Sequence, residues 1–318
     1  MQNILVIGAA GQIGSELVPE LRRRGYMTVA AGSGRTPLPT TLADGGPTAV
    51  VNLLDADALR KTVDRFKIDT VFNLAAILSA VGESKPMTAW DIGVNGIISL
   101  LELARDKRLS VFTPSSIGVF GPETPHDPTP QDTVCRPKTM YGITKVAGEL
   151  LSDYYRLKYR VDARSVRYPS LISHVTQPGG GTTDYAVDIY WKAVEKGRYA
   201  SPLARGTRLP MMFMNDALRA AIELMEADAS RLKHFNSFNV GAMSFAPEDV
   251  AASIRRRIPG FELSFDVNPL LQGIAESWPD ALDDTAAREE WDWRPEYDLD
   301  AMTDAMLEAV SCRLGKTL

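Results

Sequence analysis

Three polar side chains have the types and the order needed to move a proton to or from an alcohol. Tyr141 and Lys145 are four residues apart in a segment whose apolar residues recur at helical spacing, so both side chains leave one face of the expected helix. An ammonium one turn away favours the phenolate and lowers a phenol pKa that is otherwise about 10. The pair therefore predicts a general acid/base. Ser116, after an expected strand, is a candidate hydrogen-bond donor to a substrate oxygen.

Such a pair is more often a surface or packing feature, so the chain must also supply a cofactor site. A glycine-rich turn follows the apolar run 3–7, which predicts a buried parallel strand, and precedes a helix. Its first glycine allows a tight turn, its second lets the backbone approach a pyrophosphate, and its third lets helix and strand pack closely. The alternative is a turn without a ligand, but the strand–turn–helix context favours dinucleotide binding. The expected cofactor-binding residues here are Gly8, Gly11, Gln12, Ile13 and Gly14.

Apolar strands alternate with helices up to residue 168, which predicts an α/β fold with a Rossmann-type, doubly wound parallel sheet. Expected elements include a long helix over 88–107 and a sixth strand over 163–168. Ligands bind at the carboxyl ends of the strands in such sheets. Residues at these ends that we expect beside the cofactor are Ser33, Arg35, Asn52, Leu53, Leu74, Ala75, Ala76, Tyr168 and Pro169.

The end of the second strand leaves the cofactor preference open. Gly32 stands where an acidic residue usually holds the adenosine ribose of NAD. The sequence is compatible with NAD held by the backbone alone. It is equally compatible with tolerance of NADP through Ser33 and Arg35.

The second half of the chain predicts a smaller, substrate-binding lobe. We expect the dinucleotide-binding domain to span 1–168 and to be rejoined by about 217–242, and the lobe to comprise about 169–216 and 243–318. Thr182 and Thr183 precede an expected helix and could bind a carboxylate, or they could simply cap the helix. Trp278, held extended before a proline, could wall a small pocket.

Composition excludes several function classes. The chain has 318 residues, 45% hydrophobic and 24% charged, with a net charge of −5, which is typical of a globular protein and argues against nucleic acid as a partner. Two distant cysteines and three scattered histidines predict neither a disulfide framework nor a metal site, and they fit a reducing, cytoplasmic compartment. No signal peptide and no membrane span are expected.

Together these motifs resemble one family, the L-threonine 3-dehydrogenases of the short-chain (extended) dehydrogenase/reductase type. The glycine turn, Ser116 and the Tyr141–Lys145 pair are shared with the extended superfamily. More typical of the threonine dehydrogenases are the segments 76–80, 114–124, 179–186, 209–212 and 277–280. These segments span nearly the whole chain.

The resemblance implies oxidation of L-threonine at its β-carbon to 2-amino-3-oxobutyrate, with hydride transfer to NAD and without a metal ion. By position, Tyr141 is the general base, Ser116 holds the substrate hydroxyl, and Lys145 lowers the tyrosine pKa and binds the nicotinamide ribose. It also implies a homodimer built from the helices near 88–107 and 141–158. The substrate shell that it implies is Ser79, Ser116, Tyr141, Thr182, Thr183 and Trp278.

One residue departs from the family pattern, and two other functions compete. Gly93 stands where the family has an asparagine, and Asn95, two residues further along the helix, cannot replace it. The first rival is a nucleotide-sugar epimerase or dehydratase on the same scaffold, which needs a larger second pocket. The second is a non-catalytic dinucleotide-binding regulator, a class that usually loses the tyrosine–lysine pair, which is intact here.

Overall fold

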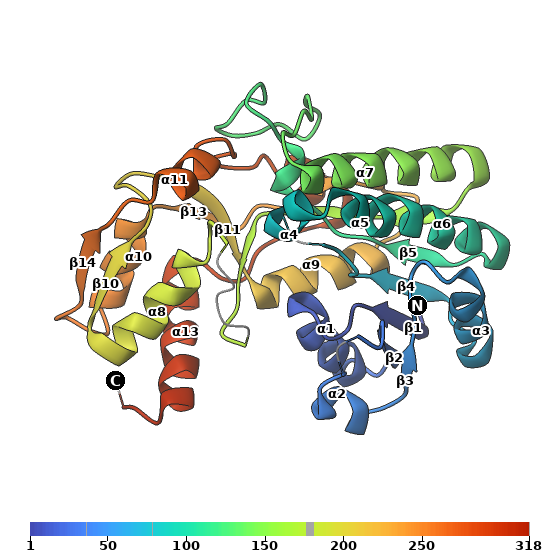
Figure 1. Ribbon diagram of the computed structural model, residues 1–318, viewed down its shortest axis with the longest axis horizontal. Coiled ribbons are helices and arrows are strands. Elements are labelled where there is room, and N and C mark those ends of the chain that lie inside the picture. Colours follow the sequence, from blue (N-terminus) through green and yellow to red (C-terminus); the bar gives the residue numbers. More distant parts are fainter. Residues whose placement is uncertain (36, 78, 176–180, 318) are drawn as a thin grey trace.

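A six-stranded parallel sheet forms the centre of the larger lobe (Figure 1). The computed structural model describes residues 1–35, 37–77, 79–175 and 181–317. The strand order is β3-β2-β1-β4-β5-β7. From β1 the chain first adds strands on one side and then, with β4, on the other, as in a doubly wound sheet. The predicted Rossmann architecture is therefore confirmed. The strands are β1 (Asn3–Ile7), β2 (Met27–Gly32), β3 (Thr48–Val50), β4 (Thr70–Asn73), β5 (Ser110–Phe112) and β7 (Asp162–Arg164).

Helices cover both faces of this sheet. Successive strand residues point to opposite faces, and in β1 both sets of side chains from Ile4 to Ile7 are apolar and buried. Ile4 and Val6 pack with one helical layer, whereas Leu5 and Ile7 pack with the other. A strand that is buried on both faces needs the continuous apolar run seen here. The first layer comprises α1 (Gln12–Arg23), α2 (Thr40–Asp44) and α9 (Met214–Glu226), and the second comprises α3 (Ala56–Phe66), α6 (Gly96–Lys107) and α7 (Met140–Tyr159).

The expected long helix over 88–107 is present but starts earlier and is not regular. It consists of α5 (Pro86–Trp90), a five-residue π-helical turn η1 (Asp91–Asn95), and α6. A further short helix, α4 (Ser79–Ser84), precedes it. These elements pack against α7, which places the π-helical turn beside the helix that carries Tyr141.

The predicted sixth strand over 163–168 is wrong in one respect, because the chain forms two strands that belong to different sheets. β7 ends at Arg164, and β8 (Val166–Tyr168) pairs instead with β6 (Ser115–Ser116) and β12 (Phe238–Asn239). Ser165 makes the change. Its carbonyl accepts from the amide of Phe238, and its hydroxyl accepts from the amide of Ser237 over 2.8 Å.

The smaller lobe has its own sheets and core. Its strand orders are β13-β11-β9 and β10-β14. Buried Met211 and Phe213 of β11 pack there against α8, α10 and α13. The elements are β9 (Ser170–Ile172), β10 (Arg198–Ser201), β11 (Leu209–Phe213), β13 (Met243–Phe245), β14 (Glu262–Phe265), α8 (Tyr185–Lys196), α10 (Pro247–Arg255), α11 (Pro269–Ala275) and α13 (Leu299–Leu314).

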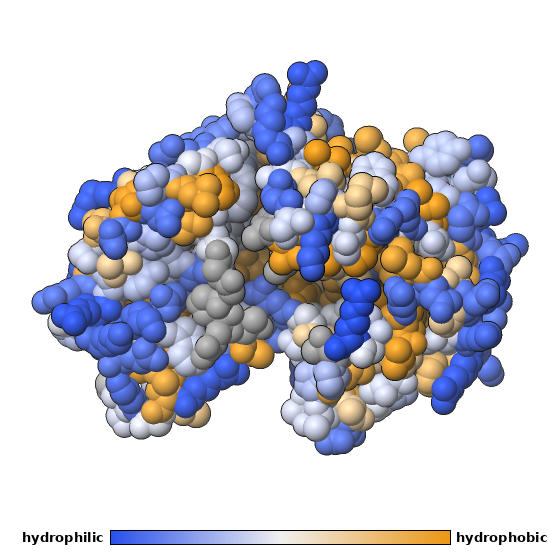
Figure 2. All heavy atoms as spheres, viewed as in Figure 1, coloured by the Kyte–Doolittle hydropathy of each residue, from blue (hydrophilic) through white to orange (hydrophobic). Residues whose placement is uncertain are grey.

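The last helix before α13 joins the larger lobe rather than the smaller one. Trp291 of α12 (Thr285–Trp291) and the neighbouring Trp293 are buried in the core that also contains α1 and α9. Figure 2 shows the surface hollowed between the two lobes. Among the described residues, no helix is long and apolar enough to cross a membrane.

Candidate active site

The glycine turn after β1 is shaped so that side chains are excluded from it. Gly8 has a φ of +81°, and a Cβ there would lie 2.9 Å from the carbonyl carbon of Leu74. A Cβ on Gly14 would lie 2.4 Å from the oxygen of Gly8. Gly11 precedes α1 in extended conformation, and no side chain of the described residues caps the helix. Free amides at a helix N-terminus suit a phosphate, so this turn fits a dinucleotide pyrophosphate.

The carboxyl end of β4 lies beside this turn and also fits a bound group. Leu74 and Ala75 approach Gly8 through their backbone, and Ala76 is exposed. The side chain of Asn73 is only 1% exposed, yet its amide has no hydrogen-bond partner among the described residues. A buried amide without a partner is costly, which is consistent with a water or ligand atom completing it.

The strand ends expected at the adenosine side are open to solvent. Ser33 and Arg35 are exposed after β2, and the Ser33 hydroxyl accepts from the Arg35 amide over 3.4 Å. Asn52 is exposed after β3, and its Oδ1 accepts from the amide of Leu54 over 3.1 Å. Leu53 instead is buried against Gly96. Polar groups able to meet a ribose therefore come from two neighbouring strands.

Ser116 and Tyr141 meet across Gly118. The amide of Gly118 donates to Oγ of Ser116 over 3.2 Å. A Cβ on Gly118 would lie 3.0 Å from Cε1 of Tyr141 and 3.6 Å from Oγ of Ser116. Gly118 thus lies between the Tyr141 ring and the Ser116 hydroxyl, directly after β6 (Ser115–Ser116).

The start of α7 sets the position of the tyrosine. Thr139 caps the helix, since its Oγ1 accepts from the amide of Gly142 over 3.0 Å. Gly142 lies so close to the loop that a Cβ would be 2.2 Å from the oxygen of Gly118. Only a glycine lets the helix approach the short 3₁₀ turn η2 (Ile117–Val119) this closely. The Thr139 cap and the close approach of Gly142 to Gly118 therefore fix the first turn of α7, which carries Tyr141.

Lys145 lies one turn further along α7, on the same side as Tyr141. Its Nζ donates to the carbonyl oxygen of Pro114 over 2.7 Å and lies 5.5 Å from the centroid of the Tyr141 ring. The structure thus brings the three sequence-predicted catalytic side chains to one place.

The absence of a side chain at Gly93 makes room for a residue of α7. A Cβ on Gly93 would lie 2.8 Å from Cβ of Thr144. Thr144 is buried, and its hydroxyl donates to the carbonyl of Tyr141 over 2.8 Å. An asparagine at position 93 would require Thr144 or the π-helical turn to shift.

The residues expected around the substrate come from both lobes, and three of them belong to the smaller one. Trp278 packs against the small cluster that contains Ile117 and Phe120, in the segment that follows Ser116. It also packs against the core of the smaller lobe. Thr182 is buried and Thr183 is half-buried in the turn that precedes α8. The side chain of Ser79 lies outside the described residues, as do the glycines at positions 179 and 180 of the glycine-rich motif.

Tyr168 and Pro169 are buried, and the tyrosine side chain already has a partner. Its hydroxyl donates to the carbonyl of Ala217 over 2.5 Å, and burial raises its pKa far above the usual range. The ring is part of the core of the larger lobe. Contact between these two residues and a cofactor would therefore rest on their backbone.

A contact between the lobes joins α1 to the segment that follows β9. The hydroxyl of Ser173 donates to Glu16 over 2.6 Å and accepts from the amide of Val175 over 2.9 Å. Arg313 of α13 donates to the carbonyl of Val175 over 3.1 Å. Burial raises the pKa of the Glu16 carboxyl, against the smaller opposing effects of Ser173 and Arg313.

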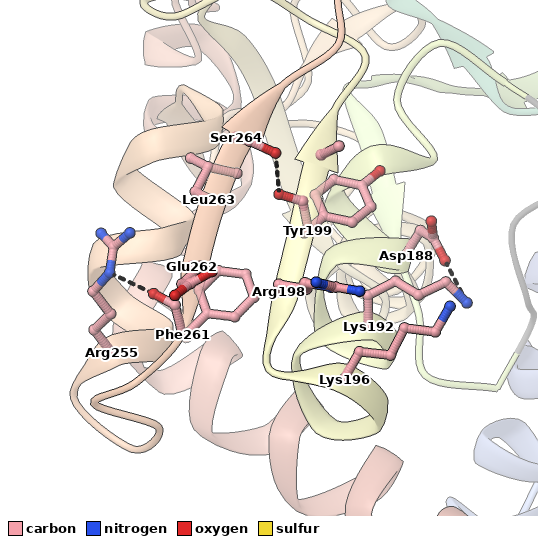
Figure 3. A pocket seen from close by; sticks show the side chains of 11 residues that line it. Asp188, Lys192, Lys196, Arg198, Tyr199, Arg255, Phe261, Glu262, Leu263 and Ser264 are labelled. Atoms are coloured by element: carbon pink, nitrogen blue, oxygen red, sulfur yellow. Dashed lines mark hydrogen bonds and ion pairs between the residues drawn. The ribbon is translucent and has the colours of Figure 1, made fainter.

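The sequence analysis did not single out Gly118, which lies between the Tyr141 ring and the Ser116 hydroxyl. A small residue two positions after the candidate serine was the available signal. The sequence also gave no indication of a hollow of about 870 Å³ on the smaller lobe (Figure 3). Its lining includes Lys192, Arg198 and Tyr199, none of which belongs to the predicted site. Among the described residues no three His, Cys, Asp or Glu side chains are grouped to hold a metal ion.

Comparison with known proteins agrees with this geometry. A model of the NAD dependent epimerase/dehydratase family matches residues 4–241. An uncharacterized epimerase/dehydratase of Staphylococcus haemolyticus is 50% identical over 311 residues, with 98% of both chains covered. The solved L-threonine dehydrogenase from Clostridium difficile is 48% identical, with a TM-score of 0.95 and 98% of both chains covered.

A monomeric L-threonine 3-dehydrogenase from a metagenome is 41% identical, with a TM-score of 0.89, and covers 98% of this chain and 100% of its own. The resemblance to threonine dehydrogenases that the motifs indicate is thereby confirmed. The chain belongs to the NAD-dependent epimerase/dehydratase family of extended short-chain dehydrogenases/reductases.

Proposed function

We propose that this protein oxidises L-threonine at its β-carbon to 2-amino-3-oxobutyrate, with bound NAD supplying the hydride acceptor. The observation that carries the proposal is the meeting of Ser116, Tyr141 and Lys145 at one place. The similarity to solved threonine dehydrogenases supports the choice of substrate.

Each of the three side chains has a defined part in this reaction. Tyr141, as phenolate, accepts the proton of the β-hydroxyl, so it must lie within hydrogen-bond reach of that oxygen. Ser116 donates a hydrogen bond to the same oxygen and keeps the C–O bond oriented. Lys145 stabilises the phenolate and, held by Pro114, is positioned to bind a ribose hydroxyl.

The substrate's ends are recognised by the smaller lobe. We assign its carboxylate to the turn of Thr182 and Thr183 before α8, where hydroxyls and backbone amides suit an anion. Trp278 supplies an apolar wall, since it packs against Ile117 and Phe120 next to Ser116. Ser79 completes the proposed shell. A dry wall strengthens the polar contacts that act on the reacting oxygen.

We further propose that NADP is tolerated alongside NAD. Gly32 presents no carboxylate to a ribose 2′-phosphate, and Ser33 and Arg35 are exposed beside it. A guanidinium is suited to a phosphate. A cytoplasmic location is proposed because Cys135 and Cys312 are both free thiols.

We also propose a homodimer formed through the helical layer of α5, α6 and α7. Exposed hydrophobic residues follow one stripe of α7 at spacings of seven, four and three residues, and Figure 2 shows hydrophobic atoms gathered over this part of the surface. A similar solved protein is monomeric, so the assembly needs its own test. The stripe consists of Ile143, Leu150, Tyr154 and Leu157, with Met87 and Trp90 of α5 nearby.

Substrate identity is tested by following NADH formation with L-threonine, D-threonine, L-allo-threonine and L-serine, with and without a chelator. We expect the highest kcat/KM with L-threonine and no loss on chelation. The family description names epimerases and dehydratases, so the rival reaction is epimerisation or dehydration, which we test with nucleotide sugars. UDP-sugars offered with NAD should remain unchanged, and their conversion without threonine oxidation would replace the proposal by its rival.

A further inference from the structure

A buried ion pair lies under the strand end that carries Ser116. Glu149 of α7 and Arg167 of β8 are 8% and 7% exposed. Nε and Nη2 of the arginine donate to Oε1 and Oε2 of the carboxylate over 3.0 and 2.8 Å. Two parallel bonds of this kind fix both side chains in orientation as well as distance. The pair therefore holds α7 in a defined position relative to β8.

The carboxylate also reaches the residue before the serine of the site. Oγ of Ser115 donates to Oε1 of Glu149 over 2.5 Å. Glu149 lies one helical turn beyond Lys145 and two turns beyond Tyr141 on the same helix. One carboxylate thus joins the strand end that carries Ser116 to the helix that carries the tyrosine and the lysine.

The guanidinium of Arg167 holds the end of β6 from the side of β8. Ser115 of β6 pairs directly with Arg167 of β8. Nη1 of Arg167 donates to the carbonyl of Gln131 over 2.9 Å and to Oδ1 of Asn239 over 3.3 Å. Asn239 in turn donates to the carbonyl of Pro130 over 3.1 Å. The loop that leads from the serine to α7 is thereby tied to the sheet.

Two buried charges are not needed for the stability of a core. Replacing a buried ion pair by hydrophobic residues of similar volume is often neutral or stabilising, because both charges lose their hydration on burial. We propose that Glu149 and Arg167 are positioning residues, which hold the Ser116 hydroxyl and the Tyr141 phenol at their working separation. This inference rests on the proposed function in one respect: the kinetic test below measures the rate of threonine oxidation.

A matched control is present three residues earlier in the chain. Arg164 is likewise buried and ion-paired, with Nε 2.7 Å from Oδ1 of Asp162. Its Nη1 donates to the carbonyls of Leu224 and Ala227 over 2.6 and 2.8 Å. These partners lie at the C-terminal end of α9 and not at the site. Arg164 shares residue type, burial and a carboxylate partner with Arg167, although Asp162 itself is 31% exposed. Among the described residues, neither side chain of this control pair forms a hydrogen bond with α7.

The test compares the double variant Glu149→Met/Arg167→Met with the control Asp162→Asn/Arg164→Met in the full-length protein. For the first we expect thermal stability to be kept, cofactor affinity to be nearly unchanged, and kcat to fall at least about tenfold, because small displacements of reacting groups are costly in rate. For the control we expect the parent kcat. A folded Glu149→Met/Arg167→Met protein with the parent kcat overturns the proposal.

Ser115→Ala decides the matter if that double variant does not fold, since it removes a single hydroxyl. We expect a lower kcat with an unchanged KM for threonine, and a parent kcat would overturn the proposal. A second readout needs no turnover. With 3-fluorotyrosine at position 141, the ¹⁹F resonance should change in Ser115→Ala and stay the same in the control.

These two readouts separate failure of the positioning role from failure of the proposed reaction. If the parent protein does not oxidise threonine but the resonance changes as expected, only the proposed function fails. If the parent oxidises threonine and the resonance stays unchanged in Ser115→Ala, the positioning role is overturned and the function stands.

Discussion

A side chain on Gly118 would touch the ring of Tyr141, because a Cβ there would lie 3.0 Å from Cε1. We therefore predict that Gly118→Ala displaces the ring by a few tenths of an ångström and lowers kcat by about tenfold, since a misplacement of about 1 Å can cost about a hundredfold. The fold should be kept, because the ring edge can move. Steady-state kinetics with thermal melting of the same samples measures both effects.

Gly273→Ala is the matched control for that variant. A Cβ on Gly273 would have nothing within 4 Å, and the residue lies in α11 of the smaller lobe. Its kcat should equal that of the parent. Equal kcat values in the Gly118 and Gly273 variants would mean that the contact with Tyr141 does not constrain the reaction.

Charge on Glu16 should make the protein less stable at neutral pH. Burial raises the pKa of this carboxyl, so the folded state holds the proton more tightly than the unfolded state does. The contribution of Glu16 to the free energy of unfolding is fully present below the pKa that this carboxyl has in the unfolded state. It is lost as the pH rises through the pKa in the folded state. Glu16→Gln removes the charge and can still accept from Ser173, so it should raise Tm at pH 7, with a gain that shrinks toward acid pH.

The neighbouring Glu20 provides the opposite case on the same helix. Its hydrogen bond to Arg23 holds the pKa of the Glu20 carboxyl below its usual value, and burial opposes this only in part. Its stabilising effect is present above the unfolded pKa and is lost as the pH falls. Glu20→Gln should therefore lower Tm at pH 7. Calorimetry across pH tests both variants, and a Glu16→Gln protein less stable than the parent at pH 7 would refute the argument.

The strand ends at the adenosine side predict weak discrimination against NADP. Gly32 offers no carboxylate, so kcat/KM with NADP should not fall far below that with NAD. Gly32→Asp should raise the preference for NAD by about tenfold or more, because a hydrogen bond to a charged group contributes about 1.5 kcal/mol or more. Rates with both cofactors measure this. A parent protein that already rejects NADP would contradict the prediction.

Dimer formation should depend on the exposed stripe of α7. Leu150 and Leu157 are 64% and 75% exposed, and the double variant Leu150→Glu/Leu157→Glu should be monomeric in sedimentation experiments where the parent is a dimer. Leu270 of α11 is 72% exposed on the smaller lobe and serves as the control. Leu270→Glu should leave the dimer intact. A parent that sediments as a monomer would remove this part of the proposal.

The parts of the fold that the sequence predicted are those with local signals. The apolar run before Gly8, the three glycines and the amphipathic α1 all lie within about two dozen residues, and each signal reflects a steric or burial requirement of that segment. The Tyr141–Lys145 spacing was equally local. The structure places both side chains and Ser116 together, as expected.

What could not be predicted depends on contacts between distant segments. The strand over 163–168 divides at Ser165 because Phe238, more than seventy residues away, binds its carbonyl. Glu149 of α7 is buried in an ion pair with Arg167 of β8, eighteen residues further along the chain. No pattern within either segment contains that information.

The most direct test of the central claim is the fate of the β-hydrogen of threonine. With L-threonine deuterated at the β-carbon and NAD, the deuterium should appear in the reduced nicotinamide. The Tyr141→Phe variant should form this product at least about a hundredfold more slowly, while binding NAD nearly as well as the parent. Absence of reduced cofactor, reduced cofactor without deuterium, or parent-like turnover by Tyr141→Phe would contradict the account.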